Sequence, residues 1–223
     1  MTQEGVIKFA LKHRAIELPT WTYATLRVLA AWRSILRSLE LIGQDGKRYE
    51  GAAWGNVSAR LPPWHDGPRR PFLITGTQTG GLIETGAENF TVVQRCDLGD
   101  GRVESEGPVA PSSEAMTHAA LYGVDEHLRF VFHAHSKEIW QHARRLELPC
   151  TPVDVEYGTQ KMAWAVEKLM EQRHTRETKT IAMLGHEDGV ITFGETPDEA
   201  GEAMMRFLAR ARALNQRNLE YLK

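Results

Sequence analysis

The segment 129–136 constrains the fold most, because it places two histidines on one short strand. The stretch Arg129–Ala134 is largely apolar and leads into His133-Ala134-His135. Side chains two positions apart on a β-strand point to the same face, so both imidazoles are expected to lie side by side. This is a metal-ligand spacing, although ordinary polar histidines at a strand end would show the same pattern. A third ligand must come from elsewhere in the chain.

Composition narrows the class of protein. With 223 residues and 42% hydrophobic residues, the chain can bury one substantial core, which excludes a disordered protein. We see no repeat, low-complexity tract or linker, and expect a single domain over residues 1–223. Its 27 basic and 29 acidic residues give a net charge of −2 with no basic block, so nucleic acid is not the expected partner.

Two cysteines, Cys96 and Cys150, are too few for a disulfide scaffold. The stretch Met1–Leu11 lacks the apolar core of a signal peptide. The longest apolar stretches end well short of the roughly 20 residues that span a bilayer. We therefore expect a cytoplasmic protein without a membrane partner.

Periodicity predicts an α/β layered domain. Trp21–Leu41 has the spacing of one long amphipathic helix, and the middle third is rich in short strands, at Asn56–Leu61, Phe72–Thr75 and Phe90–Asp97. Helices and strands then alternate: a helix entered at Pro111, the strand Arg129–Ala134, the helices Lys137–Arg145 and Gly158–Arg173, the strands Thr180–Leu184 and Val190–Phe193, and a helix from Pro197 to about Asn218.

The third candidate ligand is His186, within Gly185-His186-Glu187-Asp188-Gly189 between two expected strands. Three neutral imidazoles with an open position are typical of a catalytic metal site, with zinc the first choice and another divalent transition metal the second. Glu187 and Asp188 could orient His186, but a solvated acidic turn is the simpler interpretation.

Pro111-Ser112-Ser113-Glu114 reads as the start of a helix, where a carboxylate or a bound anion is stabilised. Ser112 and Ser113 could hold a phosphate there, but on local grounds a plain capping segment is the favoured interpretation. His118, four residues after Glu114, fits a structural hydrogen bond better than metal ligation.

Gly55-Asn56 and the run Thr75–Gly81 are turns able to aim backbone amides at an anion. They match neither the Walker loop nor the dinucleotide fingerprint, so a nucleotide-dependent oxidoreductase is disfavoured.

The ordered set of motifs carries a family resemblance. In sequence order they are GNVSAR (55–60), FLITGTQTGG (72–81), EGPVAPSSEAMTHAALY (106–122), VFHAHS (131–136), VEYGTQKMA (155–163) and GHEDGVITFG (185–194). Over about Trp21–Ala213 the chain resembles the class II aldolase/adducin family. This family includes fuculose-phosphate and rhamnulose-phosphate aldolases, ribulose-phosphate epimerase, methylthioribulose-phosphate dehydratase and the non-enzymatic adducin head domains.

The resemblance implies roles for individual residues. His133, His135 and His186 are similar to the family's three zinc ligands, and Glu114 to its catalytic acid/base. The residues that match the family's substrate-phosphate cradle are Gly55, Asn56, Thr75, Gly76, Ser112 and Ser113. The implied fold is a three-layer α/β/α sandwich around a mainly antiparallel sheet, assembled as a homotetramer with active sites at subunit interfaces.

We therefore expect a zinc-dependent, aldolase-type lyase that cleaves a small hydroxy-ketone through a metal-stabilised enediolate, with a sugar phosphate as the expected small-molecule substrate. A dehydratase or an epimerase would share the same intermediate, and an adducin-like interaction domain is the non-catalytic alternative.

Three departures from the family pattern matter. The run Thr75–Gly81 is longer than the usual Thr-Pro-Ser/Thr-Gly turn, which puts a phosphorylated substrate in doubt. Gly-His-Glu-Asp-Gly replaces Asn-His-Gly and adds acidic side chains near the expected metal. Tyr221 lies near the end of the chain, as a tyrosine does in some family aldolases, but it does not align with theirs.

Overall fold

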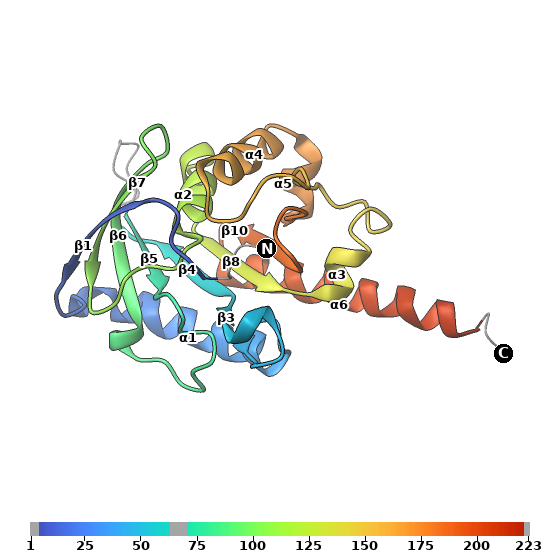
Figure 1. Cartoon of the computed structure of the whole chain (residues 1–223), viewed down its shortest axis with the longest axis horizontal. Coiled ribbons are helices and arrows are strands. Elements are labelled where there is room, and N and C mark those ends of the chain that lie inside the picture. Colours follow the sequence, from blue (N-terminus) through green and yellow to red (C-terminus); the bar gives the residue numbers. More distant parts are fainter. Residues whose placement is uncertain (1–4, 63–70, 221–223) are drawn as a thin grey trace.

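The computed structural model describes residues 5–62 and 71–220, with the backbone alone for 217–220 (Figure 1). Tyr221 lies outside the described residues. An eight-stranded sheet forms the centre, in the order β1-β7-β6-β5-β4-β8-β10-β9, and a two-stranded sheet pairs β2 with β3. Every neighbouring pair in the large sheet is antiparallel except β1 and β7.

The strands of the large sheet are β1 (Ala10–Ala15), β4 (Asn56–Arg60), β5 (Phe72–Thr75), β6 (Phe90–Asp97), β7 (Arg102–Gly107), β8 (Phe130–His135), β9 (Thr180–Ala182) and β10 (Gly189–Gly194). The small sheet consists of β2 (Gly43–Gln44) and β3 (Ala53–Trp54). The helices are α1 (Tyr23–Ser38), α2 (Ala115–Val124), α3 (Lys137–Gln141), α4 (Gln160–Met170), α5 (Arg173–Thr178) and α6 (Pro197–Glu220), with short 3-10 turns η1 (Thr20–Thr22), η2 (Tyr49–Gly51) and η3 (Ala87–Asn89).

Helices cover both faces of the sheet, which gives three layers (Figure 1). One core holds apolar side chains of α1 and α6, such as Leu29 and Phe207, and a second core holds those of α2 and α4, such as Met116 and Val166. The α/β/α sandwich around a mainly antiparallel sheet is therefore confirmed.

The alternation of β8 decides where its histidines point. Phe132 belongs to the core under α1 and α6, whereas Val131 belongs to the core under α2 and α4. Because strand side chains alternate, His133 and His135 share the face of Val131. The two candidate ligands are thereby directed to the side of the sheet on which α2 begins.

Two strands of the large sheet, β1 and β7, were not expected from the sequence, nor were the two short strands of the small sheet. The buried side of β7 carries Val103, Ser105 and Gly107, and only the valine has the apolar side chain that a strand pattern requires. β1 is an edge strand that pairs with β7 on one side only. Four of its six residues are exposed, and its sequence Ala-Leu-Lys-His-Arg-Ala has only one large apolar residue. The sequence did not predict β1 and β7, because most of their positions inside the sheet are occupied by small or polar residues, which give no strand pattern.

Some expected boundaries also shift. The helix expected from Pro111 begins at Ala115, because Pro111 is held in a bridge to Gly76. The helix expected over Lys137–Arg145 ends at Gln141. The helix expected over Gly158–Arg173 is α4, and α5 follows it as a separate short helix before β9.

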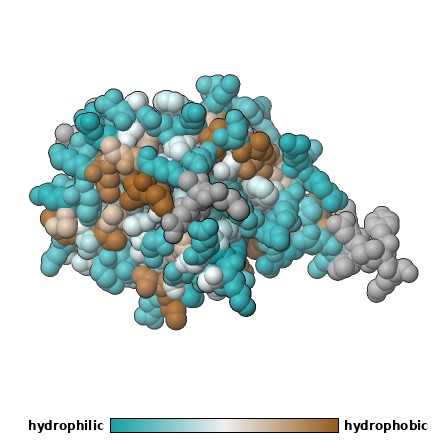
Figure 2. Space-filling view, in the orientation of Figure 1, coloured by the Kyte–Doolittle hydropathy of each residue, from teal (hydrophilic) through white to brown (hydrophobic). Residues whose placement is uncertain are grey.

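The surface seen in Figure 2 is mostly hydrophilic, with apolar patches separated by polar side chains. The most exposed large apolar residues lie on different parts of the chain: Trp21 in η1, Ile83 after β5, Val153 before α4 and Trp164 in α4. No helix among the described residues is long and apolar enough to cross a membrane.

A buried arginine of α1 fixes the loop that follows β5. Arg33 is 1% exposed. Its guanidinium donates hydrogen bonds to the carbonyl oxygens of Thr79 (2.6 Å), Gly80 (3.1 Å) and Leu82 (2.9 Å). Burial lowers the pKa of Arg33 to about 10, so the side chain remains charged at neutral pH. Arg37 Nη2 also donates to the carbonyl oxygen of Gly81 (3.3 Å), but Arg33 makes most of the side-chain hydrogen bonds from α1 to this loop.

Replacing Arg33 by Met should destabilise the protein, because Met keeps the length of the side chain but leaves buried carbonyl oxygens without a donor. We expect a loss of about 3 kcal/mol in the free energy of unfolding, measured by denaturant titration. Arg27→Met, on an exposed position of the same helix, is the matched control and should change stability by less than about 0.5 kcal/mol. Equal losses in the two variants would contradict this role.

Candidate metal centre

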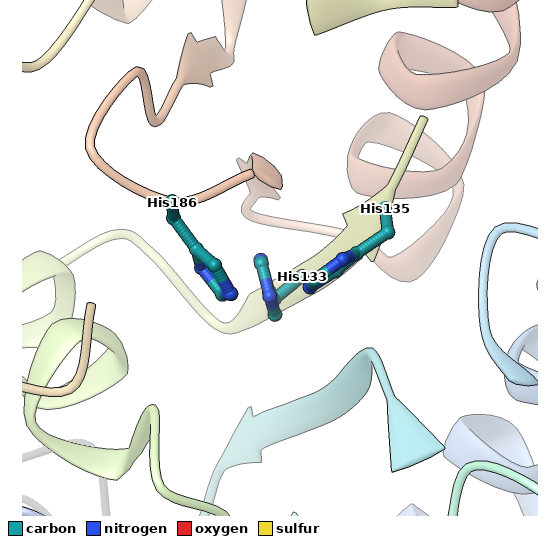
Figure 3. Close-up of side chains that lie close together, drawn as sticks. All are labelled: His133, His135 and His186. Atoms are coloured by element: carbon teal, nitrogen blue, oxygen red, sulfur yellow. The ribbon is translucent and has the colours of Figure 1, made fainter. Parts of the chain in front are cut away.

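The three histidines come from two neighbouring strands. His133 and His135 end β8, and His186 lies in the turn between β9 and β10, the strand that pairs with β8. Two backbone hydrogen bonds close this turn, from His186 N to Met183 O (3.0 Å) and from Gly189 N to His186 O (2.9 Å). The turn brings the His186 ring beside the rings of β8, and Figure 3 shows the imidazoles converging.

The geometry suits a single ion. One ligand atom from each histidine lies within 4.8 Å of the other two. The ring centroids are 4.6 to 5.1 Å apart, and each residue is at most 2% exposed. Small side-chain adjustments would place all three nitrogens at roughly 2.0–2.1 Å from one bound ion, the usual length of a zinc–histidine bond.

Hydrogen bonding and burial hold the rings in the form that binds metal. His133 Nδ1 donates to the carbonyl oxygen of Val190 (3.2 Å), which leaves Nε2 as the nitrogen with a lone pair. That Nε2 atom is buried and has no hydrogen-bond partner among the described residues. Burial, with the nearby His186, lowers the pKa of His133 and of His135 well below the ordinary value. Neutral imidazoles with this orientation fit a divalent transition metal.

A buried carboxylate lies beside the histidines. Glu114 is the N-cap residue of α2 and is 1% exposed. Its Oε2 atom accepts a hydrogen bond from Thr117 Oγ1 (2.8 Å), and its Oε1 atom lies 3.8 Å from His186 Nδ1. Glu114 therefore stands at the edge of the metal centre.

The residues predicted to form a phosphate cradle are also gathered, with one exception. Gly55, Asn56, Gly76, Ser112 and Ser113 line one small pocket. Thr75 does not line it, because its Oγ1 atom accepts the backbone N–H of Val57 (3.2 Å) inside the sheet.

Two tyrosines pack on the metal centre, and the sequence did not single them out. The Tyr49 ring meets the His135 ring edge-on with 4.7 Å between centroids, and Tyr157 stacks on His186 at 4.6 Å. Tyr49 has a φ of 47°, in the left-handed region. No periodic pattern surrounds Tyr49, so only the structure reveals its position.

The two acidic residues after His186 have different environments. Glu187 is exposed, as a solvated turn would have it. Asp188 is buried and accepts a hydrogen bond from the hydroxyl of Tyr49 (2.7 Å). Burial, and after it this hydrogen bond, raises the pKa of Tyr49 above its ordinary value. Asp188 thus restrains the tyrosine on His135.

His118 has the structural role expected of it. Its Nδ1 atom lies 2.7 Å from the hydroxyl oxygen of Ser58, which also bonds the hydroxyl of Tyr122 (2.8 Å). His118 is fully buried, and burial lowers its pKa to about 3. It is therefore a neutral member of the core beneath the site.

An open cleft of about 1010 Å³ reaches the metal centre at His135. Its lining includes Tyr49, Arg48 and Asp188, and Arg48 Nη2 lies 3.9 Å from Asp188 Oδ2. This cleft shares no lining residue with the small cradle pocket. Of the three histidines, it reaches His135.

Comparisons with known proteins agree with this geometry. Residues 44–214 match the family model described as the class II aldolase and adducin N-terminal domain. A sugar-phosphate aldolase from Thermotoga maritima superposes with a TM-score of 0.66 at 15% identity, covering 88% of this chain and 95% of that one. An L-fuculose-1-phosphate aldolase from Thermus thermophilus gives 0.62 at 20% identity, covering 87% and 94%. These structures share the fold. No curated protein matches the sequence.

Alanine at either His133 or His135 should abolish stoichiometric metal binding, because two remaining imidazoles hold a divalent ion poorly. Elemental analysis of the purified protein should find about one divalent transition metal per chain in the wild type and far less in each variant. His127→Ala, at an exposed histidine, is the matched control and should keep its metal. Equal metal content in all four proteins would refute the ligand assignment.

Stability should fall as the pH drops below about 6.5, because His118 gains a proton readily in the unfolded chain but resists it in the folded one. The pKa of His118 in the folded protein is about 3. The free energy of unfolding should therefore fall by on the order of 2–3 kcal/mol between pH 6 and pH 4 because of this residue. Denaturant titrations across this range test it against His118→Gln, whose stability should depend less steeply on pH. Identical pH slopes would show that His118 contributes nothing.

Proposed function

Because the chain belongs to the class II aldolase and adducin family, we propose that it is a metal-dependent lyase that breaks a carbon–carbon bond in a small hydroxy-ketone. The observation that supports this most is the buried Glu114 carboxylate, 3.8 Å from one of three converging histidines. A cluster of metal ligands alone would suit a structural site, whereas an adjacent carboxylate adds a group that can move a proton.

His133, His135 and His186 would hold the metal, with zinc as our first choice. A divalent cation bound there supplies a Lewis acid that stabilises the negative charge that develops on a carbonyl oxygen during bond cleavage. The chain itself contributes orientation. Val190 fixes the tautomer of His133, and the Tyr49 and Tyr157 rings pack against His135 and His186. These contacts restrain the orientation of the three rings.

Glu114 would transfer the proton. The hydroxyl of Thr117 holds one carboxylate oxygen at 2.8 Å, and the other faces His186. In the direction of cleavage, a carboxylate at this position removes the proton from the substrate hydroxyl, and the resulting carboxylic acid can return it to the carbon left behind. Both steps need only one group in one place, and a buried acid beside a cation suits both.

The alternatives within the family differ in products. Dehydration and epimerisation use the same activation of a hydroxy-ketone, so these residues also suit them. A non-catalytic adducin-like module is the remaining alternative. The complete set of three histidines with Glu114 favours an enzyme, because a binding module has no chemical need for it.

A screen of the metal-loaded protein against hydroxy-ketones and their phosphate esters, read by mass spectrometry, tests the proposal. Cleavage yields two carbonyl products, whereas dehydration yields one product lighter by a water and epimerisation leaves the mass unchanged. The proposal predicts two smaller products from at least one substrate. A metal-loaded protein that produces only one of the other outcomes would contradict a lyase of this type.

Glu114→Gln should lower turnover by roughly 10²–10⁴-fold, since glutamine keeps the size and polarity of the side chain but cannot exchange a proton. Metal content should largely survive, because the three histidines remain. Turnover and metal content are measured together on the substrate found in the screen. Glu202→Gln, at an exposed position of α6, is the control.

Turnover of Glu114→Gln within a few-fold of the wild type would remove Glu114 from the mechanism. Complete loss of the metal would instead identify it as mainly a ligand.

A further inference from the structure

We propose that Gln78 closes the cradle at Ser112 and Ser113, so that the enzyme acts on a hydroxy-ketone without a phosphate group. This inference names the substrate class of the proposed function and rests on it for the reaction. The closure itself is a matter of space and hydrogen bonds, and it can be tested without any activity.

The space left in the cradle is too small for a phosphate. The pocket between Gly55, Asn56, Ser112 and Ser113 has a volume of about 10 Å³. A cavity of this size, about one probe sphere, holds a single water molecule. A phosphate group has five heavy atoms, so it cannot enter unless a lining group moves away.

Gln78 has the longest side chain among the residues that line this pocket, and part of it is exposed to solvent. Its Oε1 atom accepts the backbone N–H of Ala53 (2.9 Å), which ties the carboxamide across the cradle. Gln78 has a φ of 58°, a backbone conformation that glycine and asparagine adopt most easily. The chain keeps a long side chain at a position that disfavours one. The longer Thr75–Gly81 run, which the sequence marked as unusual, is therefore the element that carries the closure.

The segment before β1 packs on Gln78 from outside. A Cβ atom added to Gly5 would lie 1.9 Å from Gln78 Nε2, so the backbone of Gly5 is in close contact with the carboxamide. Thr77 Oγ1 also donates to the carbonyl oxygen of Gly5 (3.4 Å). Gly5 itself lines the pocket. The carboxamide is thus held between Gly5 and Ala53.

Other contacts anchor this segment at the metal centre. Lys8 Nζ donates to the carbonyl oxygen of Tyr157 (3.2 Å), lies 3.4 Å from the centre of its ring and pairs with Glu156 (3.4 Å). Tyr157 stacks on His186. In Figure 1 the blue chain leads from β1 toward β8 and β10. The pairing of β1 with β7 fixes its other end, so the segment is held at both ends with Gly5 against the cradle.

The electrostatics of the pocket agree with the exclusion of phosphate. None of the residues that line the cradle is charged. The hydroxyl oxygen of Ser112 already accepts the backbone N–H of Glu114 (3.3 Å). The cleft beside His135, by contrast, has about 1010 Å³ of space. The uncharged remainder of a hydroxy-ketone has room there and none in the cradle.

Titration calorimetry with inorganic phosphate at constant ionic strength tests the closure directly. The full-length wild type should show no binding at millimolar phosphate. Gln78→Gly should bind phosphate at least about tenfold more tightly, because glycine empties the cradle and favours the same φ. Gln78→Asn, shorter by one methylene and also at ease with a positive φ, is the second variant if the first does not fold. Adding Ser112→Ala and Ser113→Ala to Gln78→Gly should remove the gain and thereby exclude phosphate bound elsewhere.

Two results would overturn the proposal. If the wild type binds phosphate and replacement of Ser112 and Ser113 abolishes that binding, the cradle is open. Failure of folded Gln78 variants to gain binding shows that Gln78 is not what closes it. The substrate screen separates this inference from the proposed function. A wild type that excludes phosphate yet cleaves no hydroxy-ketone refutes the reaction and leaves the closure standing, whereas faster cleavage of a phosphate ester than of its parent ketone refutes the inference alone.

Discussion

Three imidazoles buried at one point are the constraint on which the rest of this structure depends. Burial, with the nearby His186, holds the pKa of His133 and of His135 well below the ordinary value, so these two rings remain neutral at ordinary pH. The position of β8 in the sheet makes this possible, because β4 and β10 pair with it on both sides. A sheet that placed β8 at an edge would expose His133 and His135 to water and allow them to charge.

Around the three histidines the structure has an open cleft on one side and a nearly filled pocket on another. The cleft at Tyr49 and Asp188 opens on His135, while the cradle at Ser112 and Ser113 is nearly full. The loop over residues 76–82, which forms part of the cradle, is held by hydrogen bonds from Arg33 to its carbonyl groups. It is covered from outside by the segment that contains Gly5. Under the proposed function, substrate specificity would depend on this loop and this chain segment, and the chemistry would depend on residues held by the sheet.

Much of this could be predicted from sequence, and the exceptions have physical reasons. That His133 and His135 point to the same face could be predicted, because side chains alternate along a strand and this rule is local. The α/β layering could be predicted from the periodicity of apolar residues. The contacts of Tyr49 and Gln78 do not, because each depends on a positive φ and on partners far away in the chain, at Asp188 and Gly5. The edge strand β1 likewise has no pattern of its own. Family resemblance supplied the catalytic role of Glu114, which local sequence alone left as a capping residue. It also matched His186, which was already a candidate ligand from its place between two expected strands.

X-ray absorption at the edge of the bound metal tests the central claim most directly, because it reports the atoms that coordinate the ion without requiring a substrate. For the protein purified with its own metal, the account predicts a first shell that includes three imidazole nitrogens at about 2.0–2.1 Å, with the characteristic outer-ring scattering of histidine. A first shell dominated by sulfur at about 2.3 Å, or one made of oxygen alone, would contradict it.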